Sequence, residues 1–240
     1  MDVAGKVVII TGASAGIGRA TARRFAQAGA KVVVVARSED KLSALAEELR
    51  GQGHEALSLR ADMRDQSDVQ RMVEETFRTY GRIDVVINNA GQGHAGAVGE
   101  VSSSDFLCII ELNVFGPVYA IQAAVPLMRQ GGGGLIINIS SMVSKMHIPG
   151  LGAYASTKSA LNMVSDTARA ELAADNIRVI TVYPRMTATD FGKNSLGDQR
   201  WRQRQRSFAS ESSAVDSPEY VAEKILDAAQ QEPEEQFMDK

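Results

Sequence analysis

Two side chains near the middle of the chain have the types and the spacing that proton transfer needs. Tyr154 and Lys158 lie four positions apart in an alanine-rich segment, 153–172, which nothing interrupts and which we expect to be helical. Residues four apart share one face of a helix, so both side chains would point the same way. A free tyrosine has a pKa of about 10, and a neighbouring lysine cation favours the phenolate. The pair is a candidate proton donor and acceptor for an alcohol or carbonyl oxygen, although a solvated pair would have the same spacing.

A glycine-rich segment, Thr11–Gly18, is the second candidate site. It follows the apolar run Val7–Ile10 and opens an expected helix over 17–28. Glycines let backbone amides approach a pyrophosphate, and a helix N-terminus offers unpaired N–H groups there. The spacing is G-x-x-x-G-x-G rather than G-x-G-x-x-G. Between a first strand and a first helix, the segment predicts dinucleotide binding.

The end of the second apolar run bears on the choice of cofactor. Domains that bind NAD usually present an acid about 20 residues after the glycine turn, where it holds the ribose hydroxyls. Here Ala36 and Arg37 follow the run, and an arginine suits a 2′-phosphate. The acids Glu39 and Asp40 lie where the first turn of a helix favours negative charge. We therefore predict NADP, with NAD as the alternative and a solvated loop cation as the other interpretation of Arg37.

Short apolar runs alternate with helical patterns along the chain. Most runs are continuous, which is typical of strands buried on both faces of a parallel sheet. Helical stripes follow, one with Ser38 placed to cap it and one ended by Gly81. This alternation predicts an α/β fold, a Rossmann-type doubly wound parallel sheet formed by a single domain over 1–240. The expected strands are Val7–Ile10, Val32–Ala36, Ala56–Leu59, Ile83–Ile87, Leu135–Ile139 and Ile177–Val182, with a short final strand around Gln236–Met238.

Composition excludes several classes of function. The 240 residues are 44% hydrophobic and 23% charged, and the net charge is −3, which argues against general nucleic-acid binding. A single cysteine, Cys108, excludes an intrachain disulfide framework and fits a reducing compartment. The N-terminus has no signal-peptide layout, and no uninterrupted apolar run approaches the ~20 residues of a membrane span. A cytoplasmic protein without a membrane partner is the expectation.

Taken together, several motifs resemble the short-chain dehydrogenase/reductase family. They are Thr11–Gly18, Asp62, Asn88-Asn89-Ala90-Gly91, Asn113, Ser141 and Tyr154-x-x-x-Lys158, which occur in the family's order over nearly the whole chain. The resemblance implies that Tyr154 is the general acid/base and that Lys158 lowers its pKa and binds the nicotinamide ribose. Ser141, thirteen positions before the tyrosine, would polarise the substrate oxygen, and it is preferred over Ser140 and Ser144. Asn113 would help to hold a proton-relay water.

The resemblance also implies a set of cofactor contacts. Asp62 would bind the adenine amino group with Met63 against the ring, and Asn88 would brace the sheet. Pro184, Thr187 and Thr189 fall where family members bind the nicotinamide carboxamide. The full expected set is Thr11, Gly12, Ser14, Gly16, Ile17, Gly18, Arg37, Asp62, Met63, Asn89, Ala90, Gly91, Tyr154, Lys158, Pro184, Thr187 and Thr189.

Two positions depart from the family pattern. Arg185 stands where glycine usually follows Pro184, and this cation must either turn to solvent or reach toward the substrate, where it would narrow the pocket. Ala15 stands where many members that use NADP carry a basic residue. Arg37 is left as the main partner for the phosphate.

Three segments should surround the substrate: 92–98, 142–152 and 185–215, the last a substrate lid without a clear sheet pattern. The cluster Arg200–Arg206 lies in this lid and is either an anionic-substrate clamp or, as charge runs usually are, a solvated or subunit-contact face. His94 and His147 lie in pocket loops, His54 at the surface, and no metal site is expected. The residues Met142, Met146, Met186 and Phe191 indicate an apolar pocket.

These observations predict an NADP(H)-dependent oxidoreductase that interconverts a ketone or aldehyde with its alcohol. Its partners would be a small-molecule substrate and further copies of the chain, because alanines in 153–170 permit close helix packing in a homodimer or homotetramer. The alternatives are an NAD-dependent alcohol dehydrogenase of the same fold, a regulator that senses NADP(H) without catalysis, and a structural partner that uses the Arg200–Arg206 face.

Overall fold

A parallel seven-stranded sheet forms the centre of the computed structural model, which describes residues 1–198, 200–201 and 215–238. The strand order is β3-β2-β1-β4-β6-β7-β9. Every expected strand is present, including the short one near the C-terminus. The bounds are β1 (Val7–Thr11), β2 (Lys31–Ala36), β3 (Ala56–Arg60), β4 (Val85–Asn88), β6 (Gly134–Ile139), β7 (Ile177–Tyr183) and β9 (Glu235–Phe237).

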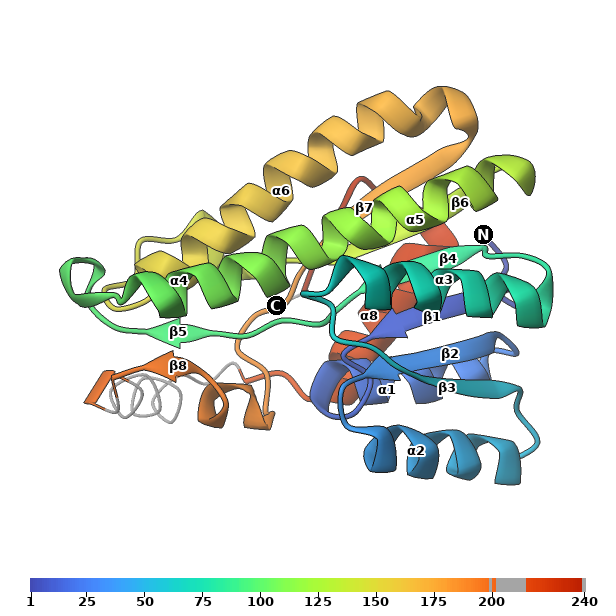
Figure 1. Ribbon diagram of the computed structural model, residues 1–240, viewed down its shortest axis with the longest axis horizontal. Helices are drawn as coiled ribbons and strands as arrows, with labels where there is room; N and C mark the ends of the chain where they lie inside the picture. Colours follow the sequence, from blue (N-terminus) through green and yellow to red (C-terminus); the bar gives the residue numbers. More distant parts are fainter. Residues whose placement is uncertain (199, 202–214, 239–240) are drawn as a thin grey trace.

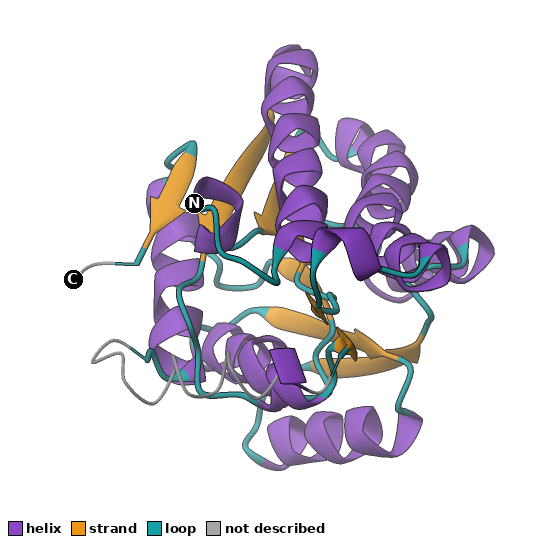
Figure 2. Cartoon of the chain, turned by 90° about the vertical axis from the view of Figure 1, so that its left-hand side faces the viewer, coloured by secondary structure: helices purple, strands orange, loops and turns teal. Residues whose placement is uncertain are grey.

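Helices cover both faces of this sheet (Figures 1 and 2). One layer contains α1 (Gly16–Gln27), α2 (Glu39–Gly51) and α8 (Pro218–Gln231), and the other contains α3 (Gln66–Tyr80), α5 (Gly116–Gln130) and α6 (Gly152–Leu172). Successive strand side chains point to opposite faces, so Val8 and Ile10 pack in the first layer's core while Val7 and Ile9 pack in the second. Strands that are buried on both faces of the sheet therefore need continuous apolar runs. The predicted doubly wound α/β fold is confirmed.

Local sequence signals set several of the helix ends. The Asp65 side chain accepts hydrogen bonds from the first amides of α3, and Gly81 ends that helix with φ +70°. Ser217 caps α8 in the same way, ahead of Pro218. Ser38 lies at the start of α2 but makes no side-chain capping bond, so the predicted cap does not form. The acidic first turn of α2 supplies the favourable charge instead.

The strand order reverses between β1 and β4. The chain moves outward from β1 through β2 to β3, and β4 then returns to the other side of β1. Ligands of open α/β sheets bind beyond the carboxyl ends of the strands at such a reversal. The turn after β1 and the loop after β4 meet there, because a Cβ added to Gly12 would lie only 2.9 Å from Ala90 Cα.

A second, very short sheet lies outside the main one. In it β5 (His94–Ala95) pairs in parallel with β8 (Leu196–Gly197), and so joins the loop after β4 to the segment after β7. Two-residue strands leave no periodic pattern, and the sequence did not predict this pair. Single 3₁₀ turns complete the described structure: η1 (Val98–Glu100), η3 (Met142–Lys145), η4 (Ala173–Asp175) and η5 (Asp190–Lys193).

One helical stretch, Ser103–Gln130, is long and apolar enough to cross a membrane by length and composition alone. It consists of α4 (Ser103–Ile110), a π-helical turn η2 (Glu111–Phe115) and α5. The α5 part packs against α3 and the strands of the sheet, where Ala120, Ala124 and Met128 are buried. These contacts are those of a core helix of a folded domain.

Candidate active site

The glycine turn after β1 has the backbone shape of an anion cradle. Gly12 and Gly16 have φ values of +68° and +53°, which residues with a Cβ rarely adopt. Ala15 precedes α1 and makes no capping bond, and the first turn of α1 has no acidic residue. The first amides of α1 therefore remain available, and the helix dipole adds positive potential there. Ser14 and Ile17 lie half-buried along this turn.

Thr11 and Asn89 lock the turn to the loop after β4. The Thr11 hydroxyl accepts bonds from the Asn89 and Ala90 amides, each 3.0 Å long, and Asn89 Nδ2 donates to the Thr11 carbonyl at 2.8 Å. A Cβ on Gly18 would lie 2.4 Å from the Gly12 carbonyl oxygen and 2.5 Å from Asn89 Nδ2. Only glycine permits this approach. The polar groups of Thr11 and Asn89 are thus used to shape the crevice, while Asn88 bonds to Asn138 and braces the sheet as expected.

The expected adenosine side contains an arginine that sequence reasoning missed. Arg64 binds the Asp62 carboxylate through two nitrogens, with Nη2 to Oδ2 at 2.6 Å and Nε to Oδ1 at 3.1 Å. This bond, assisted by the charge of Arg37, holds the pKa of Asp62 below its usual range. Asp62 is therefore ionised but already paired. The spacing Asp-x-Arg over 62–64 was the available signal.

Arg37 and Met63 differ in how the structure places them. Arg37 is exposed at the end of β2, open to a ligand. The Met63 side chain is only 4% exposed and packs in the core, which leaves little of it to face an adenine ring. The position after Asp62 thus serves mainly the core, because the loop turns inward there.

Tyr154 and Lys158 both lie on α6, one turn apart, as predicted. Lys158 is 4% exposed, and its Nζ donates to the Ile139 carbonyl at 2.8 Å, at the end of β6. Ser141 follows β6, and the interaction of its side chain with Tyr154 lowers the pKa of the phenol. The neighbouring serines are used elsewhere, since Ser140 bonds to Asn162 and Ser144 to the Ser141 carbonyl. The structure thus brings Ser141, rather than Ser140 or Ser144, to the tyrosine.

Burial controls the protonation of this pair. Loss of water raises the pKa of the Tyr154 phenol to about 12, which hydrogen bonding to Ser141 only partly offsets. Burial also lowers the pKa of the Lys158 ammonium to about 8. The tyrosine shift is opposite to the one predicted from the spacing, because desolvation outweighs the nearby cation. At neutral pH the site therefore holds a protonated phenol beside a lysine that is still largely charged.

Asn113 lies in the π-helical turn η2 and is fully buried. Its Nδ2 donates to the Gln92 carbonyl at 2.9 Å and to Thr157 Oγ1 at 3.0 Å, and its Oδ1 accepts from the Gln92 amide at 2.9 Å. A Cβ on Gly91 would lie 3.3 Å from Asn113 Oδ1 and 3.6 Å from Lys158 Nζ. Asn113 thus converges on Lys158 as expected. Its side-chain amide joins α6 to the loop after β4.

The segment after β7 approaches both the glycine turn and the serine loop. The Pro184 carbonyl accepts a bond from the Met142 amide, and the Thr187 hydroxyl donates to the Arg185 carbonyl. A Cβ on Gly16 would lie 3.1 Å from Thr189 Cγ2. Thr189 is therefore close to the cradle.

Arg185 is held in an ion pair rather than turned freely to solvent. It forms two hydrogen bonds to Asp216, with Nη2 to Oδ1 at 2.8 Å and Nε to Oδ2 at 3.1 Å. Asp216 is only 8% exposed, and its backbone pairs with Met186 and Ala188. The ion pair therefore fastens together two chain segments that lie 31 positions apart.

Other expected features are placed differently or lie beyond the described residues. His94 is a residue of β5 and is only 2% exposed, while His147 is exposed and His54 half-buried. Residues 199 and 202–214 of the expected lid, and with them most of the Arg200–Arg206 cluster, lie outside the described residues. Among the residues that are described, the structure holds no cluster of possible metal ligands.

Two further residues near Tyr154 were not singled out from the sequence. One is Gly93, which lies against the Phe191 ring and the Ser195 hydroxyl. A Cβ at this position would lie 2.9 Å from Phe191 Cε1 and 2.5 Å from Ser195 Oγ, so a side chain would not fit. Gln92 Nε2 donates to the Asn194 carbonyl at 3.0 Å and so ties the loop after β4 to the segment after η5. A lone glycine outside a recognised turn gives no sequence signal for such contacts.

Comparison with known proteins agrees with this geometry. Residues 6–200 match the sequence pattern of the family described as short chain dehydrogenase. The oxidoreductase YxnA of Bacillus subtilis is 36% identical over 231 residues, which are 94% of this chain. The chain spans 63% of the length of that relative.

Solved structures are similar over almost the entire chain. A short-chain dehydrogenase/reductase from Burkholderia phymatum, in complex with NAD, has a TM-score of 0.92 at 23% identity, covering 99% of this chain and 90% of the other, and so supports the fold. L-Sorbose reductase from Gluconobacter frateurii, in complex with NADPH and L-sorbose, has a TM-score of 0.84 at 33% identity, covering 95% and 91%. The similarity extends through the segments that carry the candidate site.

Proposed function

Since the chain belongs to the short-chain dehydrogenase/reductase family, we propose that it is an NADP(H)-dependent oxidoreductase that interconverts a ketone or aldehyde with its alcohol. The observation that carries the proposal is the meeting of Ser141, Tyr154 and Lys158 beside the crevice between β1 and β4. The glycine turn fits a dinucleotide diphosphate, because Gly12 and Gly16 have positive φ values and the first amides of α1 have no side-chain cap. When bound, the nicotinamide would supply or accept a hydride at the carbonyl carbon.

The chain's own residues would control the proton. In the reducing direction the Tyr154 hydroxyl donates its proton to the carbonyl oxygen, and burial keeps that proton in place at neutral pH. Ser141 would hold the same oxygen with a hydrogen bond. The Lys158 ammonium would stabilise the phenolate left behind, because an opposite charge in a dry site favours the charged form. Reduction is the direction that this protonation state favours.

The proposal is tested by Tyr154→Phe, which removes the hydroxyl and keeps the ring. We expect turnover to fall by at least about 100-fold, since general acid catalysis contributes about 10²–10⁴-fold, while NADPH affinity stays within a few-fold. Steady-state rates on a panel of carbonyl compounds and a fluorescence titration with NADPH measure the two quantities. Undiminished turnover in the variant would refute the assignment. A wild type that binds NADPH but reduces no carbonyl would instead support a sensing role.

We further propose that NADP is preferred over NAD. Arg37 is exposed at the end of β2, where a 2′-phosphate would enter, and the charges of Arg37 and of Arg64, which bonds to Asp62, both act on the Asp62 carboxylate. The similar solved structures hold NAD in one case and NADPH in the other, so the preference rests on these cations.

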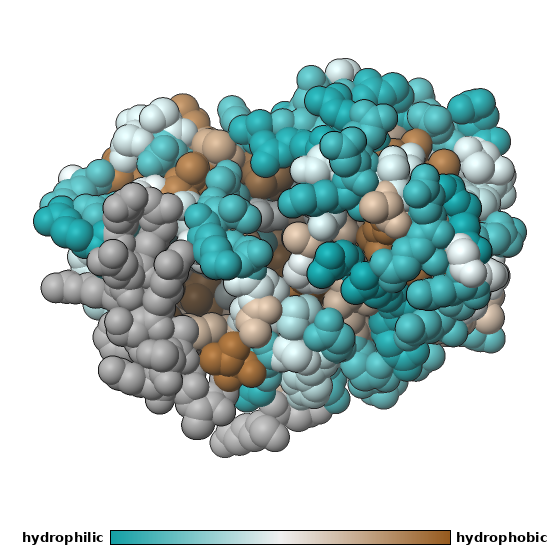
Figure 3. Space-filling model, turned by 90° about the horizontal axis from the view of Figure 1, so that it is seen from below, coloured by the Kyte–Doolittle hydropathy of each residue, from teal (hydrophilic) through white to brown (hydrophobic). Residues whose placement is uncertain are grey.

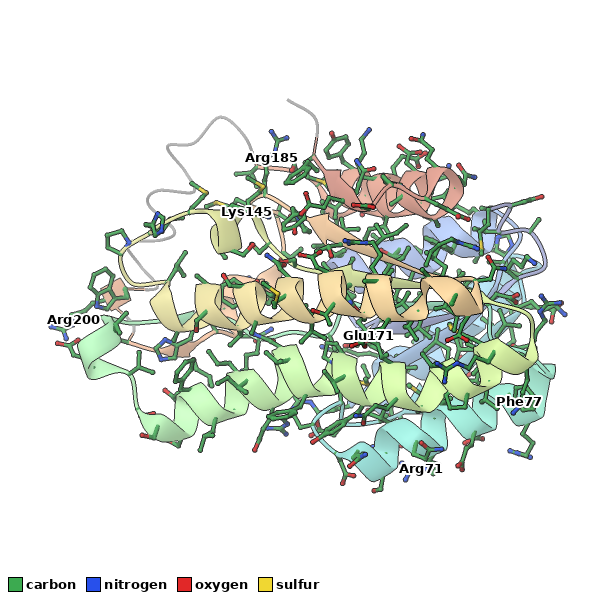
Figure 4. The ribbon with its side chains drawn as sticks, turned by 90° about the horizontal axis from the view of Figure 1, so that it is seen from above. Arg71, Phe77, Lys145, Glu171, Arg185 and Arg200 are labelled. Atoms are coloured by element: carbon green, nitrogen blue, oxygen red, sulfur yellow. The ribbon has the colours of Figure 1, made fainter. Side chains whose placement is uncertain are left out.

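A homodimer or homotetramer in the cytoplasm completes the proposal. An apolar groove of about 320 Å³ runs between α5 and α6, lined by Val118, Ile121, Met163, Val164 and Ala168 among others. Figure 4 looks onto this face, with Glu171 projecting between the two helices. Met163 is 67% exposed at the groove, a large apolar side chain that a partner helix would cover. Met163→Glu should then give monomers by size-exclusion chromatography with light scattering, and unchanged assembly would contradict this interface.

A further inference from the structure

Phe191 lies directly against the ring of the candidate general acid. It belongs to the 3₁₀ turn η5, and its ring centroid is 5.7 Å from that of Tyr154 with an angle of 53° between the planes. Tilted ring pairs at this separation are favourable contacts. Phe191 is nevertheless 39% exposed, so part of its ring faces open space beside the phenol.

The position of Phe191 is fixed by contacts on several sides. Its amide donates to Thr189 Oγ1 at 3.3 Å, and its carbonyl accepts from Ser195 Oγ at 3.2 Å. Gly93 supplies the space for the ring, because a Cβ there would lie 2.9 Å from Phe191 Cε1. The β5–β8 pair that follows holds both segments in register. The ring is therefore seated against the loop after β4.

Exposed apolar side chains occur in all three segments expected to enclose the substrate. They include Val98, Met146 and Met186, which are 73%, 49% and 42% exposed. The face drawn in Figure 3 has hydrophobic surface in and beside a hollow. The polar side chain of Gln92 is bonded to the Asn194 carbonyl. The Phe191 ring, partly exposed beside Tyr154, therefore offers carbon surface to a ligand.

We propose that Phe191 is a specificity-determining residue, whose ring packs against the larger substituent of the carbonyl substrate and selects compounds in which that substituent is bulky and apolar. The inference rests on the proposed function, since it names the substrate class of the same site. Burying an apolar group against the ring is favourable, whereas a hydroxyl group placed there would lose its hydrogen bonds to water. Small polyhydroxylated ketones are therefore poor substrates.

Two ketones that differ at one end test the selection. 4-Phenyl-2-butanone and 4-hydroxy-2-butanone share the methyl ketone, and only the first carries an apolar ring. We expect wild type to favour the phenyl compound by at least about tenfold in kcat/KM. Phe191→Ala should raise KM for the phenyl ketone by about tenfold, with kcat changed less, and should leave the hydroxy ketone within about twofold. Phe237→Ala is the matched control, because Phe237 also stacks on a tyrosine and is 41% exposed, but lies on the edge strand β9.

A preference of wild type for the hydroxy ketone, or an equal loss of both activities in Phe191→Ala, would overturn the inference. Calorimetric titration of 4-phenyl-2-butanone into the NADP⁺ complex supplies a readout that needs no turnover. Weaker binding by Phe191→Ala than by wild type supports the inference, and equal binding or none to wild type overturns it. Failure of the proposed function is a separate result, namely no reduction of any carbonyl by wild type.

Gly93→Ala provides a second variant that keeps the Phe191 ring. The added methyl group must displace Phe191 and Ser195, so we expect the same selective rise of KM for the phenyl ketone. Gly99→Ala is its control, since a Cβ at Gly99 meets nothing within 4 Å. Equal changes of this KM in Gly93→Ala and Gly99→Ala would contradict the role assigned to the position of the Phe191 ring.

Discussion

The two halves of the crevice are held by different kinds of contact. The cofactor half, formed by the turn 11–18 and the loop 88–91, is joined by close backbone packing at glycines, and the Thr11 hydroxyl and the Asn89 side-chain amide bond to backbone groups across that contact. The substrate half, formed by the described parts of 92–98, 142–152 and 185–215, is joined by the Arg185–Asp216 ion pair and the Phe191–Tyr154 ring contact, and its backbone pairing there is the short one between β5 and β8. Backbone contacts leave almost no freedom in residue type. Side-chain contacts can be exchanged, so specificity can change there while the cofactor stays in place.

The largest expected difference between the two halves is the effect of a glycine-to-alanine substitution on NADPH affinity. Gly18→Ala places a methyl group 2.4 Å from the Gly12 carbonyl oxygen, whereas Gly192→Ala meets nothing within 4 Å. Overpacking costs about 1–3 kcal/mol, and its upper end corresponds to about 100-fold in affinity. We expect Gly18→Ala to weaken NADPH binding by about 100-fold and Gly192→Ala by less than about twofold. Fluorescence titration measures both, and circular dichroism verifies that each variant is folded; similar affinities would contradict the difference between the halves.

The ion pair of the substrate half should contribute to stability. Arg185→Met leaves the nearly buried Asp216 carboxylate without its charged partner, which we expect to cost about 2 kcal/mol and to lower Tm by about 4–8 °C. Arg200→Met is the matched control, because the Arg200–Asp198 pair belongs to the same segment but its arginine is 82% exposed. Exposed pairs contribute about 0–1 kcal/mol, so that variant should melt within about 2 °C of wild type. Calorimetry measures both melting temperatures. Equal values for the two variants would show that the Arg185 pair stabilises the fold no more than the exposed Arg200 pair does.

The smallest expected effect lies in the cofactor half. Arg37→Ala removes one exposed cation from the proposed 2′-phosphate site, and a hydrogen bond to a charged group is worth about 1.5 kcal/mol, or about tenfold in affinity. NADP binding should weaken by about this factor, while NAD binding stays within about twofold. Arg78→Ala, which removes an exposed cation of α3, should change neither. Equal losses for both cofactors would remove the basis for the NADP preference.

Much of the cofactor half could be predicted from the sequence. Its strands are local apolar runs, its glycines stand at fixed spacing, and Tyr154 and Lys158 are one turn apart on one helix. Each of these signals spans fewer than ten residues, and the backbone geometry that it specifies depends little on the rest of the chain. Ser141 was selected instead by the resemblance to the family, in which the serine lies thirteen positions before the tyrosine.

Other features depend on residues that are distant in sequence. Arg185 meets a partner 31 positions away, and Phe191 contacts a tyrosine 37 positions before it. The Met63 side chain, expected against the adenine ring, packs in the core in one cluster with residues of α3 and α5. No periodic pattern records such contacts.

The sequence by itself determined the doubly wound sheet and the glycine turn, because periodicity and short spacings specify local backbone structure, and its resemblance to a family singled out the candidate reacting side chains. Only the tertiary structure decided how those side chains are protonated and what surrounds them. The pKa of Tyr154 rises and that of Lys158 falls because the assembled fold removes water from both groups. Solvent exclusion depends on all the packed elements together, so it cannot be predicted from any short segment of the chain.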